Sequence, residues 1–402
     1  MGFGTAGKVE LDIPGSSTSQ AIAMAEQGKR LLVLCKAYVD GKVCTFIFAL
    51  LDNGMLDSSF AGQGMLRVPF AEEAHVVPVD LQVSSDGRFV VLAENRSRFR
   101  SVPLLARYGA DGSPDSGFGN GGVVSLHQGD KVVSDEPTAV LVFADASLMV
   151  AATRFDTGGT ASALLVRLQP DGTLAQGFHQ QGYFELQLQE QLDVSLDGLM
   201  QQRDGGVVVW GVEGTSGLLL RLDNEQQLDS GFASDGVARL VLPAIYRQPG
   251  LEIFDVAEDE SGCLLVVGAT ASAPHAGILT RITGEGRPDP LFNGGMIRVN
   301  TAVVQGSRWL RVFCQEDGDI IAAGLAGVPY NGEATQLLVG RYLTQGGLDT
   351  RYGAGRGMWA TNVGRGADIT TCALAWGDSR LVLGGVSAAG PEGRCCLVCY
   401  QV

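Results

Sequence analysis

Short apolar runs separated by tight polar turns fill the chain from one end to the other. Many runs are rich in Val, Leu and Ile, and the turns before them often pair a polar residue with glycine. Three such pairs of turn and run are Gly28-Lys29 before 31–37, Asp204-Gly205 before 206–211, and Asp317-Gly318 before 320–326. Because Asp-Gly turns between such runs are typical of β-hairpins, the pattern predicts antiparallel strands throughout.

One longer segment recurs along the whole sequence and is centred on an aromatic residue. Its best copy is Arg107–Gly122, with the sequence RYGADGSPDSGFGNGG. The aromatic positions are Phe3, Phe60, Phe118, Phe178, Phe232, Phe292 and Tyr352, which are 54 to 60 residues apart. Four apolar runs accompany each complete copy, so each unit is predicted to be a four-stranded antiparallel meander.

The two ends of the sequence favour a closed ring over an open array of these sheets. The chain begins within a repeat and finishes within another, and joining its ends would give a spacing of 53 residues. We therefore predict an all-β, seven-bladed β-propeller that forms a single domain over 1–402. A strand at about 5–13 completes the last blade, about 365–402, and removes an exposed sheet edge.

The repeated residues have a structural interpretation. An aromatic side chain once per blade is expected to wedge between neighbouring sheets. The aspartate three residues earlier is expected to cap the local turn through its own backbone. These aspartates are Asp57, Asp115, Asp229, Asp289 and Asp349.

The repeat also resembles a known family. Arg107–Ser113, followed by Asp115, Phe118 and Gly119, is similar to the delta-60 repeat of bacterial proteins, many of them surface-associated or secreted. The resemblance covers nearly the whole chain and implies a scaffold, with no catalytic residues to transfer. Tyr352 in place of Phe, and Ala175-Gln176 in place of Leu-Asp before Phe178, depart from the pattern.

Charge and hydropathy exclude several classes of protein. The net charge of −15 in 402 residues and a pI near 4.7 argue against nucleic-acid binding, which needs excess Lys and Arg to release counterions. No apolar run reaches the length of a membrane helix, and the first residues lack the features of a secretory signal. The compartment stays open between a cytoplasmic protein, export by a signal-free route and a trimmed secreted protein.

Catalytic and metal-binding motifs are missing from the sequence. There is no GxSxG elbow and no HExxH pair, and the four histidines are widely separated. Cys396 and Cys399 have zinc-finger spacing, but residues three apart on a strand point to opposite faces. We therefore predict no metal and no cofactor. Cys35 and Cys44 bracket one hairpin, and whether they form a disulfide depends on its register.

Candidate binding residues gather in the loops that a propeller would place on one face. The loop Asn95–Pro103 carries a dense basic and aromatic cluster in an otherwise acidic protein. Such side chains are enriched at binding hot spots and suit an acidic partner. The candidates are Arg96, Arg98, Phe99, Arg100, His75, Tyr246, Arg247, Trp309 and Tyr330.

Three functions fit this sequence. A scaffold that presents its loop face to a protein or a glycan is favoured, because variable loops on a repeated framework are typical of binding. A hydrolase or lyase acting on a glycan in the central channel is the alternative, and a cluster of carboxylates would support it. A structural or cell-surface module is the third.

Overall fold

A computed structural model gives the structure of the protein. It describes residues 2–70, 75–97, 100–126, 134–186, 188, 192–243, 250–300, 303, 306–327, 335–363, 368–377, 379–388 and 393–402. Helical structure in these ranges consists of two 3-10 turns, η1 (Asn293–Gly295) and η2 (Gly353–Gly355). Across the same ranges, no helix has the length and apolar character needed to cross a bilayer.

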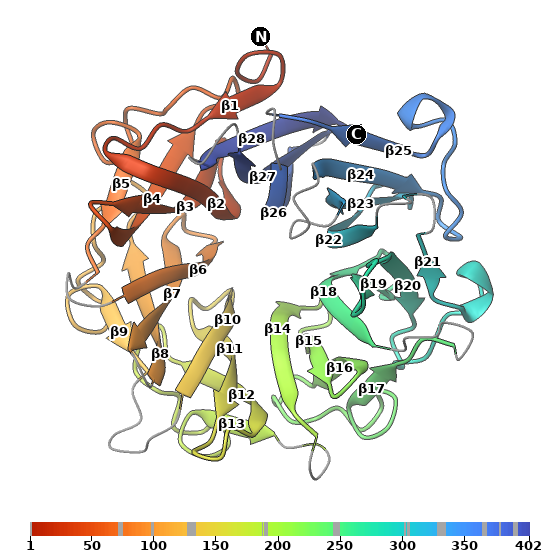
Figure 1. The fold of residues 1–402 in the computed structure, drawn as a ribbon. Coiled ribbons are helices and arrows are strands. Elements are labelled where there is room, and N and C mark those ends of the chain that lie inside the picture. The colour runs from red at the N-terminus through yellow and green to blue at the C-terminus, as the bar shows by residue number, and fades with distance from the viewer. Residues whose placement is uncertain are drawn as a thin grey trace. The chain divides into compact units, whose positions relative to one another are not determined.

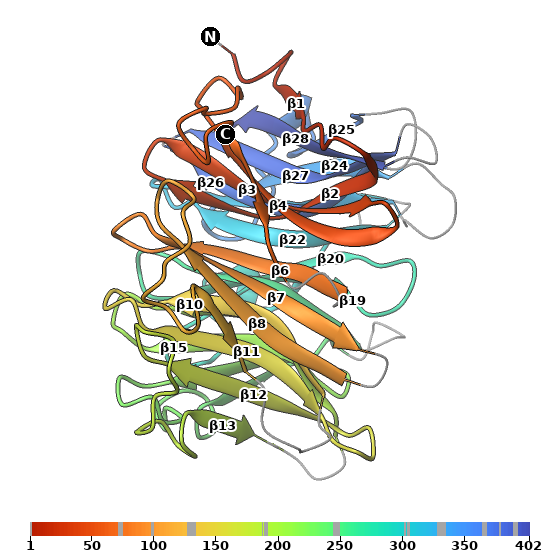
Figure 2. The same ribbon diagram turned by 90° about the vertical axis from the view of Figure 1, so that its left-hand side faces the viewer.

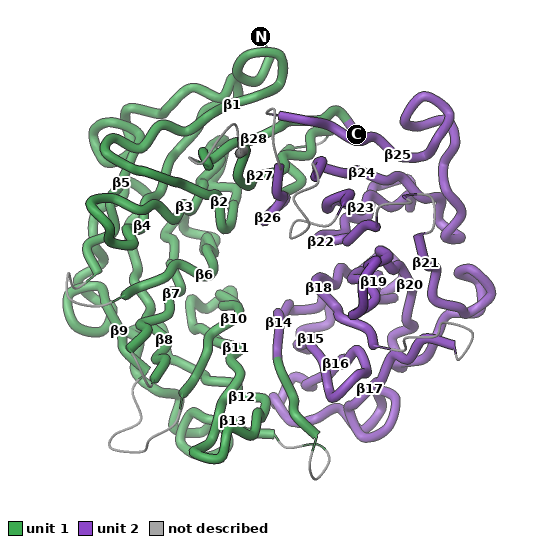
Figure 3. The backbone as a smooth tube through the Cα atoms, in the orientation of Figure 1, with its two compact units in different colours: residues 1–195, 374–401 green, residues 196–373, 402 purple. Residues whose placement is uncertain are grey.

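The strands form seven four-stranded sheets, and the fold is a seven-bladed β-propeller with antiparallel blades, as predicted (Figure 1). We number the blades 1 to 7, from β2–β5 as blade 1 to the sheet of β26, β27, β28 and β1 as blade 7. The residues group into two compact units (Figure 3). The prediction of a single domain over 1–402 stays a prediction.

The first unit, residues 1–195 and 374–401, contains blades 1 to 3 and most of blade 7. Figure 2 shows blades 1 to 3 from the side. Its strands are β2 (Ser16–Gln27), β3 (Arg30–Val39), β4 (Lys42–Leu50) and β5 (Met65–Val68) in blade 1; β6 (His75–Val83), β7 (Phe89–Ser97), β8 (Arg100–Tyr108) and β9 (Val123–Ser125) in blade 2; β10 (Ser134–Val142), β11 (Leu148–Phe155), β12 (Ala161–Leu168) and β13 (Tyr183–Leu186) in blade 3; and β27 (Arg380–Ala388), β28 (Gly393–Gln401) and β1 (Lys8–Glu10) in blade 7.

The second unit, residues 196–373 and 402, contains most of blade 4 and all of blades 5 and 6. Its strands are β14 (Val194–Gln201), β15 (Val207–Glu213), β16 (Ser216–Leu222) and β17 (Val237–Leu240) in blade 4; β18 (Leu251–Glu258), β19 (Leu264–Thr270), β20 (Gly277–Ile282) and β21 (Arg298–Val299) in blade 5; and β22 (Ser307–Cys314), β23 (Ile320–Ala326), β24 (Gln336–Tyr342) and β25 (Met358–Thr361) in blade 6. The remaining strand of blade 7, β26 (Asp368–Trp376), has residues in both units.

Blade 7 is completed by the N-terminal strand. β1 pairs antiparallel with β28, with Lys8 opposite Val398 and Glu10 opposite Cys396, so the first strand lies beside the last one (Figure 1). The amide of Leu11 extends the pairing by donating to the carbonyl of Cys395 at 3.0 Å. The predicted closing strand is confirmed, although its regular part is only three residues long.

The aromatic anchors join neighbouring blades through a glycine. The ring of Phe118 in blade 2 lies against Gly172 in blade 3, where a Cβ would stand 2.9 Å from the ring. Beside it, Gly119 donates its N–H to the carbonyl of Asp171 at 2.8 Å. Phe60, Phe232 and Phe292 repeat the ring contact at Gly112, Gly286 and Gly346. The predicted wedge between sheets is therefore confirmed at these positions.

The aspartate of the repeat caps its turn and also holds an arginine. Asp115 Oδ1 accepts the N–H of Gly117 at 3.0 Å, and Oδ2 accepts from Arg107 Nε at 2.8 Å. The same turn cap and arginine pairing recur in blades 4, 5 and 6 at Asp229, Asp289 and Asp349 with Arg221, Arg281 and Arg341. The predicted turn cap is confirmed at these positions, and the arginine partner is a further tie within blades 2, 4, 5 and 6.

Blade 3 shows what happens where the aspartate is missing. Ala175 occupies its position, and Arg167 instead donates to the carbonyl of Leu148 at 2.9 Å and to Ser147 Oγ at 2.7 Å. Its guanidinium also stacks on Phe143, 3.9 Å from the ring centroid. Hydrogen bonds and cation–π stacking thus replace the ion pair.

Candidate functional site

The predicted basic cluster lies at the end of the β7–β8 hairpin in blade 2. The loop there is shorter than the predicted Asn95–Pro103, because β7 continues to Ser97 and β8 begins at Arg100. Arg96 and Arg100 therefore occupy strands, where cross-strand hydrogen bonds hold their backbone. Arg98 and Phe99 fall outside the described residues.

An open pocket of about 330 Å³ lies beside this hairpin, and we call it the hairpin pocket. Its lining residues are Asn95, Ser97, Arg100, Val102 and Ser125. Arg100 contributes a guanidinium, Asn95 an amide and the two serines hydroxyl groups. Within the described part of the chain, the buried Nε of Arg100 has no hydrogen-bond acceptor. The pocket therefore offers several donors around one permanent positive charge.

Arg96 points to a different network. Its Nε lies 2.7 Å from Glu94 Oε2, and Glu94, which is buried, also accepts a short hydrogen bond from the hydroxyl of Ser101. His75 lies directly opposite Arg96 in the β6–β7 ladder and is exposed. The structure thus brings His75 and Arg96 together, but it neutralises Arg96 through Glu94.

Further charged side chains from blades 1 and 3 influence this region. Burial, and next the positive charge of Arg96, lower the pKa of Lys36 in β3. Burial, and next the carboxylate of Glu94, raise the pKa of Glu136 in β10. Glu94 pairs with Arg96, whereas Arg100 lines the hairpin pocket without an ion-pair partner among the described residues.

Trp309 is not a surface anchor, which corrects the sequence-based prediction. It lies in β22 with 0% of its surface exposed. The indole fills a slot left by two glycines: a Cβ on Gly277 would come within 2.7 Å of it, and a Cβ on Gly340 within 2.9 Å. β22 begins at Ser307, so Trp309 lies within a strand and not in the predicted surface loop. Its side chain belongs to the core.

Its neighbour Arg308 meets a histidine instead. Arg308 Nη2 lies 2.7 Å from His275 Nε2, and His275 Nδ1 lies 2.7 Å from the carbonyl of Thr270. A carbonyl can only accept, so Nδ1 carries the proton and Nε2 accepts from the guanidinium. This arrangement uses both ring nitrogens for structure and leaves no free base for catalysis.

Two aspartates on the first strands of blades 4 and 5 have raised pKa values. Burial among surrounding protein atoms, and next the Glu252 carboxylate, raise the pKa of Asp197 to about 7, although its side chain keeps contact with solvent. Burial raises the pKa of Asp255 to about 6, while Arg311 and the amide of Val312 oppose this. Asp255 Oδ2 accepts that amide proton at 2.9 Å and so ties blade 5 to blade 6. Sequence reasoning missed both residues.

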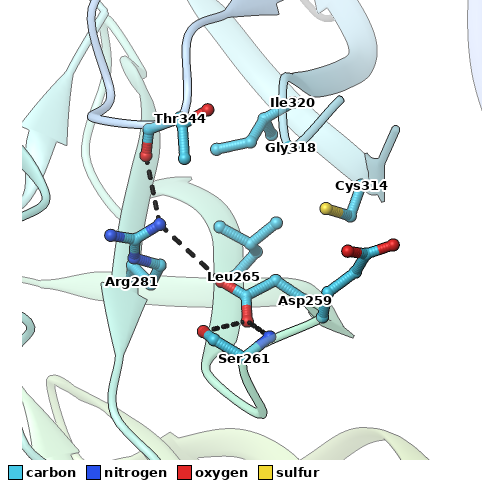
Figure 4. A pocket seen from close by; sticks show the side chains of 9 residues that line it. Asp259, Ser261, Leu265, Arg281, Cys314, Gly318, Ile320 and Thr344 are labelled. Carbon is cyan, nitrogen blue, oxygen red and sulfur yellow. Dashed lines mark hydrogen bonds and ion pairs between the residues drawn. The ribbon is translucent and has the colours of Figure 1, made fainter. Parts of the chain in front are cut away.

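A smaller groove of about 150 Å³ lies between blades 5 and 6 (Figure 4). Arg281 donates to the carbonyl of Thr344 at 3.1 Å, and Asp259 Oδ1 accepts from the amide of Ser261 at 2.9 Å. Burial, and next the carboxylates of Asp259 and Glu260, raise the pKa of the Cys314 thiol. Polar groups of the lining thus hydrogen-bond to one another, and the raised pKa favours the protonated thiol, which is the less reactive form.

Three predicted residues, Tyr246, Arg247 and Tyr330, lie outside the described residues. Over the parts of the chain that are described, no three His, Cys, Asp or Glu side chains gather as metal ligands. All eight cysteines, including Cys35 and Cys44, are free thiols.

Comparison with known proteins gives the fold. No family model matches the sequence, and no curated protein does. Among solved structures, the polysaccharide lyase Uly1 aligns with a TM-score of 0.51 at 10% identity, over 95% of this chain and 90% of that one. A structure from a study of two prolyl endopeptidases aligns with a TM-score of 0.50 at 13% identity, over 96% of this chain and 50% of that one. At such identities the similarity extends to the propeller and no further.

Proposed function

We propose that this protein is a binding propeller that holds an anionic group of a glycan or protein ligand in the hairpin pocket. The observation that carries the proposal is Arg100, whose Nε has no acceptor among the described residues and which lines an open pocket of about 330 Å³. A buried donor without a partner costs free energy, and a rotation of the Arg100 side chain that turns its guanidinium toward an oxyanion in the pocket would relieve that cost.

The rest of the pocket suits the same ligand. A guanidinium binds a carboxylate, sulfate or phosphate through two parallel hydrogen bonds. Asn95 and Ser97, two residues apart on β7, point to the same face of the strand and add an amide and a hydroxyl. Val102 supplies an apolar wall. The framework is rigid β-structure, so the donors are already in place before binding.

The resemblance to the delta-60 repeat supports the same proposal. A repeat defined by scaffold residues, with loops that differ from blade to blade in this chain, is suited to presenting different binding sites on one framework. We therefore place this chain among bacterial propellers of that kind as part of the proposal.

Binding measurements on Arg100→Gln test the function. The probes are oligogalacturonate, a neutral cello-oligosaccharide and a poly-glutamate peptide, each titrated by calorimetry into the parent and the variant. We expect an acidic probe to bind, to weaken as salt rises, and to lose about tenfold in affinity in Arg100→Gln. Arg356→Gln, a change at an exposed arginine of blade 6, is the matched control and should bind like the parent.

Two results would count against this proposal. One is equal binding of the acidic and the neutral oligosaccharide, because the site would then not distinguish a charged ligand from a neutral one. The other is an acidic probe that binds Arg100→Gln as tightly as the parent, because the ligand would then lie elsewhere.

A glycan-acting hydrolase or lyase is the second candidate, and Asp197 favours it. Surrounding protein atoms and the Glu252 carboxylate raise the pKa of the Asp197 carboxyl to about 7 while its side chain still contacts solvent, and these are properties of a general acid. The propeller of a polysaccharide lyase shows that such a fold can host this chemistry. Incubation with polyuronates, followed by reducing-end and 4,5-unsaturation assays, tests it. Product formed by the parent and lost in Asp197→Asn would support the enzyme, and no product would leave binding as the function.

A further inference from the structure

Two cysteines from distant parts of the sequence meet where blade 1 packs against blade 7. Cys35 lies in β3 and Cys395 in β28, 360 residues later, and their sulfur atoms are 3.4 Å apart. Both side chains are fully buried, with 0% of their surface exposed. Two sulfur atoms at this distance are in van der Waals contact. A small rotation of the two side chains would bring the sulfur atoms to the disulfide bond length of about 2.05 Å.

The backbone on both sides of this pair is held firmly. The amide of Cys395 donates to Ser19 Oγ in β2 at 2.9 Å, and its carbonyl accepts from Leu11 at 3.0 Å. Cys35 sits in the middle of blade 1, opposite Phe46 in β4. These contacts fix both Cα positions and keep the thiols facing each other across the two blades.

The other candidate partner of Cys35 is less well placed. In the β3–β4 ladder, Ala37 and not Cys35 lies opposite Cys44. Cys35 and Cys44 are thus diagonal neighbours, a pair whose β-carbons lie too far apart for a disulfide. The sulfur of Cys44 instead accepts a hydrogen bond from Arg67 at 3.4 Å.

We propose that Cys35 and Cys395 are a disulfide site that covalently joins blade 1 to blade 7. The reaction is exchange with an external disulfide such as oxidised glutathione. One cysteine thiolate attacks the glutathione disulfide and releases one glutathione thiolate, and the second cysteine then attacks the mixed disulfide and releases the other. The protein loses two electrons and two protons, and the glutathione disulfide is reduced to two thiols.

The burial of the pair decides when this reaction takes place. The neighbouring Cys35 thiol, followed by burial, raises the pKa of Cys395, so the thiolate that must attack is scarce in the folded protein. Glutathione disulfide also has no access to fully buried sulfur. The bond therefore forms while blade 1 and blade 7 are still coming together, and once formed it is protected from reductants.

Refolding of the full chain from denaturant, in oxidised or in reduced glutathione, tests the proposal. We expect the oxidised product to lose two hydrogen atoms in mass and to give one linked peptide pair containing Cys35 and Cys395. The disulfide closes a loop of 360 residues, so the oxidised chain should migrate faster than the reduced chain on a non-reducing gel. The loop constrains the unfolded chain, so the unfolding midpoint should rise by about 5 °C over the reduced protein.

Single variants complete the test. In Cys35→Ala and in Cys395→Ala the two refolding conditions should give the same midpoint, while Cys44→Ala, in the same hairpin, should keep the difference. Peptide mapping of the parent needs no variant to fold. If both Cys35 and Cys395 from the oxidised product remain open to alkylation after unfolding, or if either is linked to a different cysteine, the proposal is wrong.

Discussion

At the scale of the residue, glycines determine how closely the blades approach. Two features require a glycine at position 172. Its φ is +87°, and a Cβ there would lie 2.9 Å from the ring of Phe118. Gly159, in the β11–β12 turn of the same blade, has a similar φ of +83° but open space around it. A side chain at Gly159 would therefore cause backbone strain alone, whereas one at Gly172 would cause backbone strain and a steric clash.

We expect Gly172→Ala to destabilise the protein by about 3 kcal/mol and Gly159→Ala by about 1 kcal/mol. Both variants place a Cβ on a left-handed backbone, but only the first also displaces a packed aromatic ring. Denaturant titration of the two variants measures the difference. Equal losses would mean that Phe118 moves aside without cost, and the packing argument would fail.

At the scale of the element, the first strand of several blades carries a β-bulge at one position. In blade 5 the register with β19 shifts between Ile253 and Asp255, and in blade 6 it shifts between Trp309 and Arg311. A bulge redirects the next side chain, and in blade 5 it allows Asp255 to reach the amide of Val312. A partly buried carboxyl is thus used as a hydrogen-bond acceptor between neighbouring blades.

This use of a carboxyl makes stability depend on pH. The pKa of Asp255 in the folded protein, about 6, is higher than in the unfolded chain, so its contribution is present below about pH 4 and is lost as pH rises through 6. An asparagine side chain at this position would keep the acceptor oxygen without a charge. We expect Asp255→Asn to match the parent near pH 4 and to exceed it by about 1–3 kcal/mol at pH 7.

Thermal unfolding of the parent and of Asp255→Asn over this range of pH measures the effect. Asp12→Asn, at an exposed aspartate, is the control and should follow the parent. A variant that is less stable than the parent at pH 7 would show that the charged form is the stabilising one.

At the scale of the whole molecule, blade 7 depends on strands from the two ends of the chain. β1 supplies its outer strand through Lys8–Glu10, and Phe3 packs edge-on against Trp376 with ring centroids 6.0 Å apart. Without these residues, β28 would present an unpaired edge and Trp376 would lose a neighbour.

Deleting residues 1–13 should therefore lower the unfolding midpoint by several degrees and promote aggregation that increases with concentration, because an open strand edge pairs with other chains. Calorimetry and light scattering measure the two effects. Phe3→Ala is the matched control, since it keeps the strand and removes only the ring, and it should lower the midpoint without aggregation. Unchanged stability after the deletion would contradict the closing role of β1.

The repeat made the architecture predictable from the sequence. Local hairpin signals such as Asp86-Gly87 recur with one aromatic anchor per unit, and a strand pattern repeated at a fixed spacing leaves few ways to cover each sheet. The closing strand was predictable for the same reason, because the first residues match the part of the repeat that the last unit lacks. These inferences depend on local sequence patterns and on the number and spacing of the repeats.

Contacts between residues far apart in the sequence were decided only by the tertiary structure. Tryptophan is a residue type that is common at surface binding sites, yet Trp309 is buried in the space left by Gly277 and Gly340, which have no side chains. Pairing within one hairpin was also not evident from the sequence: Arg96 and Arg100 look equivalent, but Glu94, two residues from Arg96, pairs with it, while the Nε of Arg100 has no acceptor in the described residues. The approach of Cys35 to Cys395 depends on how two blades pack. Burial and pairing are properties of the surroundings of a side chain, and in a propeller those surroundings come from the next blade, roughly one repeat or a whole chain length away.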